Sequence, residues 1–204
     1  TGAYNTAVGK NSLRANTTGA NNVAMGKNVL EVNTTGTQNT AVGAFALDAN
    51  IGADNNTAVG YNSLTLSTTG ANNASVGAFS LAANTEGSHN NAFGTAAMAK
   101  NTTGDNNVAI GCGALCTNTT ADNNTAVGFN SLKTNQTGAS NVAVGSCALQ
   151  DNTGSSNTAV GQETLLQNTS GAYNAAFGFE ALKNNTTAQN NSAFGTCALK
   201  SNTT

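Results

Sequence analysis

Large apolar residues recur along this chain at fixed distances from a glycine, and polar residues fill the positions between them. Each glycine follows a larger apolar residue, which an Ala precedes in every coil but that of Ser75, as in Ala7-Val8-Gly9. A Leu usually comes four residues after the glycine, as at Leu13. The repeated glycines are Gly9, Gly26, Gly43, Gly60, Gly77, Gly94, Gly111, Gly128, Gly145, Gly161, Gly178 and Gly195. Self-similarity at one short period is the sequence signature of a solenoid, so the pattern predicts a single repeat domain over residues 1–204.

Every step between these glycines is 17 residues, except that from Gly145 to Gly161, which is 16. The missing residue lies near 149–154, where the turn reads Asn152-Thr153-Gly154 and has one threonine in place of two. A deletion in a turn leaves the flanking strands in register. The sequence therefore predicts twelve stacked coils.

The apolar columns predict an all-β, parallel β-roll with two short strands in each coil. The residue before the glycine is Val, Ile, Met or Phe in every coil, and the residue four after it is Leu in all but one coil, which has Met98. Adjacent strand residues face opposite sides, so either these large residues or the uniform alanines face the coil interior. Both arrangements leave a second uniform face, which indicates an equivalent chain packed alongside in a parallel homo-oligomer, most simply a trimer.

An asparagine stands four residues before the glycine in every coil. These residues are Asn5, Asn22, Asn39, Asn56, Asn73, Asn90, Asn107, Asn124, Asn141, Asn157, Asn174 and Asn191. A buried amide can donate to one neighbouring coil and accept from another, so this column predicts a structural Asn ladder along the rod. A second column, seven after the glycine, is Asn except at Ser67, and we expect it near the other turn.

Eight asparagines of the second column lie in Asn-x-Ser/Thr sequons and are candidate glycan acceptors. They are Asn16, Asn33, Asn101, Asn118, Asn135, Asn168, Asn185 and Asn202. Asn50, Asn84 and Asn152 keep the asparagine where the sequon is absent. That pattern favours selection by packing over selection by glycosylation, and both interpretations stay open.

Composition and chemistry indicate neither an enzyme nor a charged partner. Charged residues make up 8% of the chain and the net charge is −2, with no basic stripe for nucleic acid. No apolar run is long enough for membrane insertion. His89 is the single histidine, and Cys112, Cys116, Cys147 and Cys197 lack further ligand partners, so we expect no catalytic residues, no metal site and no cofactor.

The core pattern Asn-x-Ala-[Val/Ile]-Gly with its following small-Leu pair resembles the head repeats of trimeric autotransporter adhesins. It is equally similar to the Asn-Thr-Ala-Val-Gly arrays in the shafts of phage tail fibres and bacterial surface proteins. The resemblance covers all twelve coils. It implies a left-handed, trimeric β-roll that is extracellular, at the cell surface or on a virion fibre, and acts as a spacer or an adhesive head.

The leading expectation is a structural extracellular fibre or filament subunit, built by coil stacking and lateral self-association. Both end coils match the consensus and show no cap, so we expect either that flanking domains belong at the ends or that the ends stack on other copies to make a filament. The alternative is a ligand-binding surface: an adhesin head that recognises host matrix or glycan, or an ice-binding array of paired threonines such as Thr17 and Thr18. Those threonine rows are interrupted at Ile51, Gly52, Glu86 and Gln136.

Overall fold

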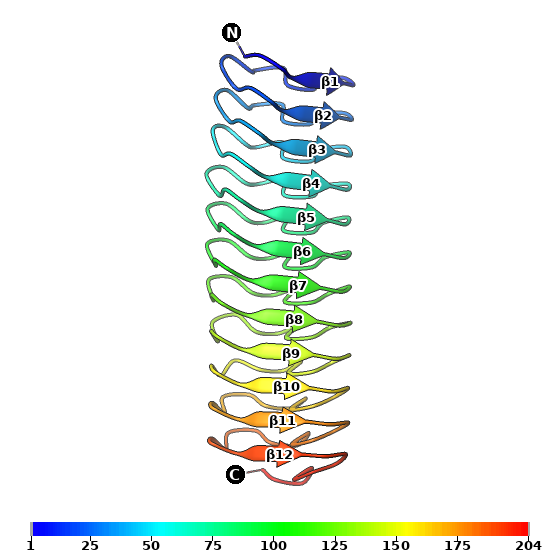
Figure 1. Ribbon diagram of the computed structural model, residues 1–204, viewed down its shortest axis with the longest axis vertical. Coiled ribbons are helices and arrows are strands. Elements are labelled where there is room, and N and C mark those ends of the chain that lie inside the picture. Colours follow the sequence, from blue (N-terminus) through cyan, green and yellow to red (C-terminus); the bar gives the residue numbers. More distant parts are fainter. Residues whose placement is uncertain (1, 204) are drawn as a thin grey trace.

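The computed structural model describes residues 2–203, which form a straight stack of coils with the two ends of the chain at opposite ends of the rod (Figure 1). Each coil contributes one three-residue strand. The strands are β1 Thr6–Val8, β2 Val23–Met25, β3 Thr40–Val42, β4 Thr57–Val59, β5 Ala74–Val76, β6 Asn91–Phe93, β7 Val108–Ile110, β8 Thr125–Val127, β9 Val142–Val144, β10 Thr158–Val160, β11 Ala175–Phe177 and β12 Ser192–Phe194. Each coil takes the name of the strand that it contains.

All twelve strands lie in a single sheet in sequence order, and each pairs in parallel with the next. Equivalent repeat positions face one another, as in the pairing of Ala109 with Ala126. The register also holds across the shortened coil, where Ala143 pairs with Ala159. These pairings confirm the parallel β-solenoid and show that the missing residue does not shift the register of the strands.

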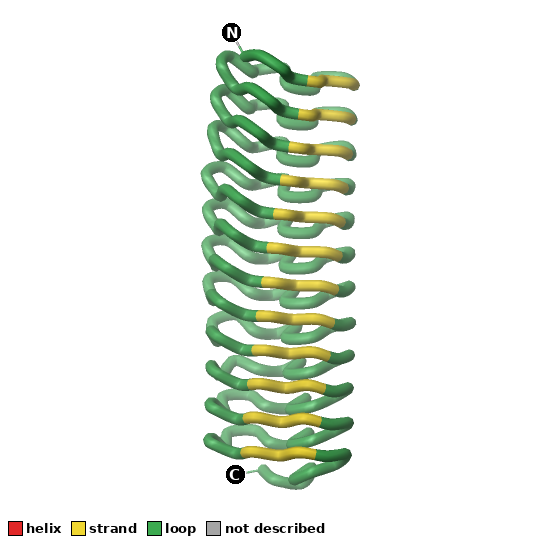
Figure 2. The backbone as a smooth tube through the Cα atoms, in the orientation of Figure 1, coloured by secondary structure: helices red, strands yellow, loops and turns green. Residues whose placement is uncertain are grey.

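The second strand expected in each coil is absent from the described residues, and a series of turns takes its place (Figure 2). The backbone is left-handed at the second and fourth residues after each glycine, for example at Cys147 (φ 58°) and Leu149 (φ 50°). A β-strand needs negative φ at every residue, so these positions exclude one. A left-handed leucine costs about 1–2 kcal/mol, and contacts with neighbouring coils must offset it.

The narrow interior is filled by alanine from the strand and leucine from the turn segment. Ala109 and Leu115 have no exposed surface, whereas Ile110, between Ala109 and the glycine, is 43% exposed. Of the two arrangements left open by the sequence, the one with alanine inside is therefore correct for the strand, but its placing of leucine on the outside is wrong. Leucine joins the alanine inside, because the turn backbone that carries it does not follow the strand alternation of faces.

The glycine after each strand makes the bend that the sequence predicts. Gly111 has φ +131°, and a Cβ there would lie 2.5 Å from the carbonyl oxygen of Gly128 in the next coil. Both the left-handed backbone and this close approach require the absence of a side chain. Coil spacing at this edge is thus set by backbone-to-backbone contact between glycines.

The Asn ladder is confirmed, and the second Asn column lies beside it. Asn107 donates through Nδ2 to the carbonyl oxygen of Ala121 at 2.9 Å, and its Oδ1 accepts the N–H of Asn124 in the next coil at 2.9 Å. Asn118, from the second column, donates to Asn101 Oδ1 at 2.7 Å and to the same Ala121 oxygen at 3.0 Å. The expectation that the two columns lie near different turns is therefore wrong, because one carbonyl joins them.

Candidate interaction surface

The residues just before the glycines form a continuous row on the outside of the sheet, which we call the apolar stripe. It consists of Val8, Met25, Val42, Val59, Val76, Phe93, Ile110, Val127, Val144, Val160, Phe177 and Phe194. None of the twelve is buried, and the stripe includes a parallel ring stack of Phe177 on Phe194 with centroids 5.0 Å apart. The stripe runs the full length of the sheet, one large apolar side chain for each coil.

The residues two positions earlier share this face and keep it uncharged. They are small or medium-sized, for example Thr125, Val142 and Ala175, and no charged residue occurs in this column or in the stripe. Exposed apolar surface that is contiguous over many residues marks an interaction site more often than scattered exposed residues do. The outer sheet face is therefore the leading candidate for an interface.

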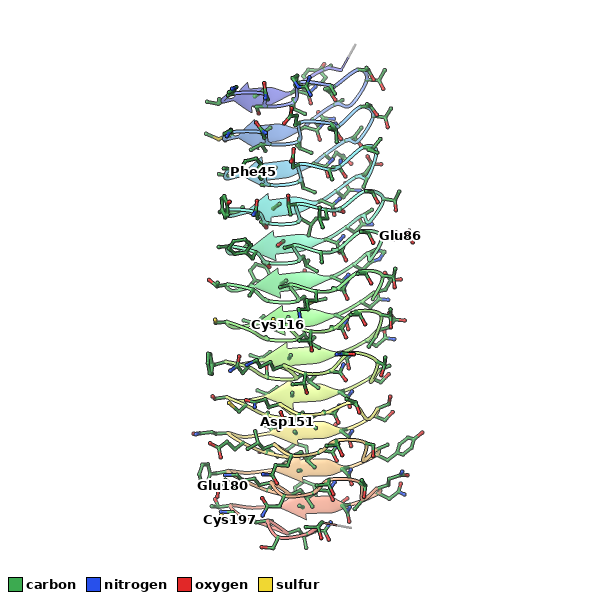
Figure 3. All side chains as sticks on the ribbon, turned by 180° about the vertical axis from the view of Figure 1, so that it is seen from behind. Phe45, Glu86, Cys116, Asp151, Glu180 and Cys197 are labelled. Carbon is green, nitrogen blue, oxygen red and sulfur yellow. The ribbon has the colours of Figure 1, made fainter. Side chains whose placement is uncertain are left out.

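A cluster of aromatic rings lies at the edge formed by the glycine bends, where Phe45 projects in Figure 3. Tyr61 packs edge-on against Phe45 and Phe79, with ring centroids 6.1 and 5.4 Å apart. Lys27 Nζ lies 5.3 Å from the Phe45 ring centroid, a cation–π distance. Tyr61 is 49% and Phe79 44% exposed, so the cluster remains open to a ligand.

The opposite edge, marked by Glu86 in Figure 3, carries the paired threonines. The first threonine of each pair uses its hydroxyl within the rod: Thr102 Oγ1 donates to the Thr119 carbonyl oxygen at 3.0 Å. The second, such as Thr103, is exposed, and its hydroxyl makes no hydrogen bond within residues 2–203. An ice-binding surface would thus have one free threonine row, not the two that the sequence suggested.

The candidate glycan acceptors are ladder residues in the folded rod. Asn33, Asn101, Asn118, Asn135, Asn168 and Asn185 have no exposed surface, and Asn16 and Asn202 are half-buried. Their Nδ2 atoms donate hydrogen bonds within the rod, as Asn168 does to Asn152 Oδ1 at 2.7 Å. A glycan on the six buried amides would have to be attached before the coils stack.

Ion pairs link the coils of β10, β11 and β12 on the turn segment. Lys183 Nζ lies 2.6 Å from carboxylate oxygens of both Glu163 and Glu180, and Lys200 Nζ lies 2.6 Å from Glu180. Hydrogen bonds from Lys183 and then Lys200 lower the pKa of the Glu180 carboxyl to about 2. Hydrogen bonds to Glu163 and Glu180 raise the pKa of Lys183. These groups hold adjacent coils together, and all their charges are matched.

A second charged group lies near the other end of the rod. Arg14 pairs with Glu31 at 2.9 Å across one junction. Burial, and then the charge of Glu31, raises the pKa of Asp48. Neither this group nor the ion pairs above form a cleft.

The histidine and cysteines are dispersed. His89 is exposed, and all four cysteines are free thiols. Within residues 2–203 no three His, Cys, Asp or Glu side chains gather as a metal site would require. The same residues include no helix that could cross a membrane.

A comparison with protein-family models finds no matching family, and comparisons with curated proteins and solved structures find no significant match. The resemblance to adhesin and tail-fibre repeats therefore stays a prediction based on the repeat pattern. Function has to be argued from the surfaces of the rod itself.

Proposed function

We propose that this chain is a structural rod, a subunit of an extracellular fibre, that associates side by side with further copies of itself. The observation that supports the proposal most directly is the uncharged apolar stripe along the whole sheet. A partner that contacts every coil must share the axial repeat of about 4.8 Å. A second copy of this chain, lying parallel and in register, has that repeat.

The size of the outer sheet face favours three chains over two. Twelve parallel strands make a face about 53 Å long, and three-residue strands make it about 10 Å wide, so it offers roughly 500 Å². Each partner in a standard protein interface contributes about 800 Å². In a trimer each chain contacts two neighbours and also buries residues on either side of the sheet face. The area that each chain buries then comes nearer to about 800 Å².

The extracellular location is part of the proposal and is supported by the resemblance of the repeat alone. The work of such a rod is to provide length and stiffness. The paired strands, glycine contacts and Asn ladders described above connect each coil to the next with few contacts at longer range, as in other solenoids. Length can then change by whole coils without changing the cross-section.

Charge substitution in the stripe tests the proposal. Ile110→Asp places a carboxylate on the outer sheet face, where association would desolvate it, so we expect the assembly to dissociate into folded single chains. Thr103→Asp is the matched control: Thr103 is exposed on the edge that carries the paired threonines, away from the stripe, so this variant should leave the assembly intact. Sedimentation velocity gives the mass and circular dichroism the fold; equal masses for both variants and wild type would refute lateral association through this face.

A second candidate function is ligand binding at the aromatic cluster of Phe45, Tyr61 and Phe79. Partly exposed rings packed edge-on suit the apolar face of a neutral sugar. No interior contact requires aromatic residues there, since other coils have Ser146 at the position of Tyr61 and Ala96 at that of Phe45 and Phe79. Tyr61→Ala should abolish binding of soluble cello- and chito-oligosaccharides measured by calorimetry. Phe129→Ala, in the same column but without an aromatic neighbour, should not change it.

A further inference from the structure

The edge formed by the Asn-Thr-Thr-Gly segments, which we call the turn edge, has a regular set of bonds between coils. At the junction of the β6 and β7 coils, the N–H groups of Thr102, Thr103 and Gly104 donate to the Thr119 carbonyl oxygen at 2.9, 3.2 and 3.4 Å. The Thr102 hydroxyl donates to the same oxygen, and in the second Asn column Asn118 donates to Asn101 Oδ1 at 2.7 Å across the junction. We refer to a junction with this set as closed.

The junction between the β3 and β4 coils lacks all of these bonds. The N–H groups of Ile51, Gly52 and Ala53 make no hydrogen bond with the described residues, and Ile51 replaces the threonine that would supply the hydroxyl. Asn50 Oδ1 is buried without a partner, because Ser67 stands where the next ladder asparagine would donate. A hollow of about 310 Å³, lined by Ile51, Gly52, Ala53, Thr68 and Thr69, opens at this place.

The junction between the β8 and β9 coils shows the same losses. The N–H groups of Gln136, Thr137 and Gly138 have no hydrogen-bond partner among residues 2–203, and Gln136 again replaces the threonine. Asn135 Oδ1 and Asn124 Nδ2 are the other two buried polar atoms without a partner in the described chain. The coil that follows is the shortened one, whose turn has one residue fewer, and its carbonyl groups accept no hydrogen bond from these three N–H groups.

Three junctions carry alanine in place of the turn glycine, at Ala53, Ala121 and Ala188, and they show what this change does. A Cβ on Gly36 would lie 2.6 Å from the next coil's carbonyl oxygen, so Ala53 and Ala121, in the same column, must push the following coil away. After Ala121 the backbone bonds stretch to 3.4 and 3.5 Å but survive, and the Thr119 hydroxyl still donates at 3.3 Å. After Ala188, at the last coil, the backbone N–H groups of Thr186 and Thr187 make no hydrogen bond with the described residues, but the Thr186 hydroxyl donates to the Thr203 carbonyl oxygen at 3.0 Å. After Ala53, where Ile51 has no hydroxyl, both kinds of bond are absent.

The sheet continues through both open junctions. β3 pairs with β4, and β8 with β9, at all three residues. The first Asn ladder also crosses, since the Asn56 N–H donates to Asn39 Oδ1 at 2.9 Å and the Asn141 N–H donates to Asn124 Oδ1 at 2.9 Å. The leucine segment crosses as well, since the Leu47 N–H donates to the Ser63 oxygen at 3.1 Å and the Leu132 N–H donates to the Ala148 oxygen at 3.0 Å. The interruption is therefore confined to the turn edge.

From this asymmetry we propose that the rod is jointed. It bends at two fixed places by opening the turn edge, while the sheet and the leucine segment stay bonded and act as the hinge, and the joints divide it into segments of three, five and four coils. Missing backbone bonds and unpartnered buried groups lower the free energy needed to open a segment. The joints give a long fibre defined points of flexure, and they depend on the rod fold but not on lateral association.

Amide hydrogen exchange of the full chain tests the joints directly. We expect the amides of Ile51, Gly52 and Ala53 to exchange at least tenfold faster than those of Thr102, Thr103 and Gly104 in the closed junction. Equal protection at the two junctions would overturn the proposal. The comparison uses the wild-type chain, so a folding defect in a variant does not affect it.

A pair of repair variants then tests the cause. The double variant Ile51→Thr with Ala53→Gly restores the threonine hydroxyl and the turn glycine, and it should slow exchange there at least tenfold. The matched control, Ile51→Val with Ala53→Gly, differs from it by a methyl group in place of the hydroxyl. Equal protection in both variants would show that the hydroxyl does not close the junction and would overturn its assigned role.

Distance distributions between spin labels test bending. Labels on Thr35→Cys and Glu86→Cys span the β3/β4 joint. Labels on Thr69→Cys and Thr120→Cys have the same separation along the rod and span three junctions that keep their backbone and threonine-hydroxyl bonds. All four sites are exposed, and the native cysteines are replaced by serine. The first pair should give the broader distribution, and equal widths would contradict a joint.

Discussion

Replacing Asn107 by leucine should destabilise the rod, although the two side chains are similar in size and the site is completely buried. Asn107 accepts the N–H of Asn124 and donates to the Ala121 oxygen and to Asn90 Oδ1. Leucine leaves the Asn124 N–H buried without a partner, whereas the Ala121 oxygen keeps its second donor, Asn118. One orphaned buried donor costs about 1–3 kcal/mol, and the lost amide bonds about 1 kcal/mol more.

We therefore expect the free energy of unfolding to fall by about 2–4 kcal/mol, measured by urea denaturation with circular dichroism. Asn184→Leu is the matched control, because the Asn184 side chain makes no hydrogen bond within residues 2–203 and is half-buried. The control should change stability by less than about 0.5 kcal/mol. Equal midpoints for Asn107→Leu and the wild type would refute the claim that the ladder stabilises coil stacking.

Three further predictions concern the bend, the core and the ion pairs. Gly111→Ala should lower the free energy of unfolding by about 2–4 kcal/mol in a urea melt, because of its positive φ and its contact with the next coil's backbone. Gly52→Ala would meet only a threonine side-chain hydroxyl and should lower it by less than about 1 kcal/mol. Leu115→Ala empties part of the core and should cost about 2–5 kcal/mol in the same assay. Because the pKa of Glu180 is lowered, its ion pairs stabilise the last coils at pH values above the ordinary glutamate pKa, and this contribution disappears as the pH falls toward 2. Amide exchange measured against pH should show that loss in the wild type and not in Glu180→Gln.

The period, the parallel stacking and the Asn ladder could be predicted because each follows from identical residues at a fixed spacing. The second strand could not. A Leu column in register suits a strand as well as a turn, and only the left-handed φ of residues such as Leu149 separates the two. Propensity gives no signal for this, because leucine rarely adopts that conformation and does so here under the constraint of stacking.

The orientation of the strand also needed the structure. Alternation shows that Ala109 and Ile110 face opposite sides, but not which side is inside. The coil proved too thin for large residues from both segments, so the strand supplies alanine and the turn supplies leucine. The apolar stripe, the main candidate interface, follows from that choice.

The two open junctions had a visible signal in the sequence. Ile51 and Gln136 are exceptions in the threonine column, and Ser67 is the exception in the second Asn column. Read separately, each exception is an ordinary substitution. Their effects combine only when the turn edges of adjacent coils are placed against one another, since each bond there joins residues of two different coils.

Solution X-ray scattering on the wild-type chain, which gives mass and length from one sample, tests the central claim most directly. A single chain of 20.2 kDa stacked over twelve coils has a mass of roughly 0.35 kDa for each Å of rod. The lateral assembly that we propose predicts about three times this value for a trimer. A rod of single-chain mass per length at all concentrations would contradict self-association through the apolar stripe.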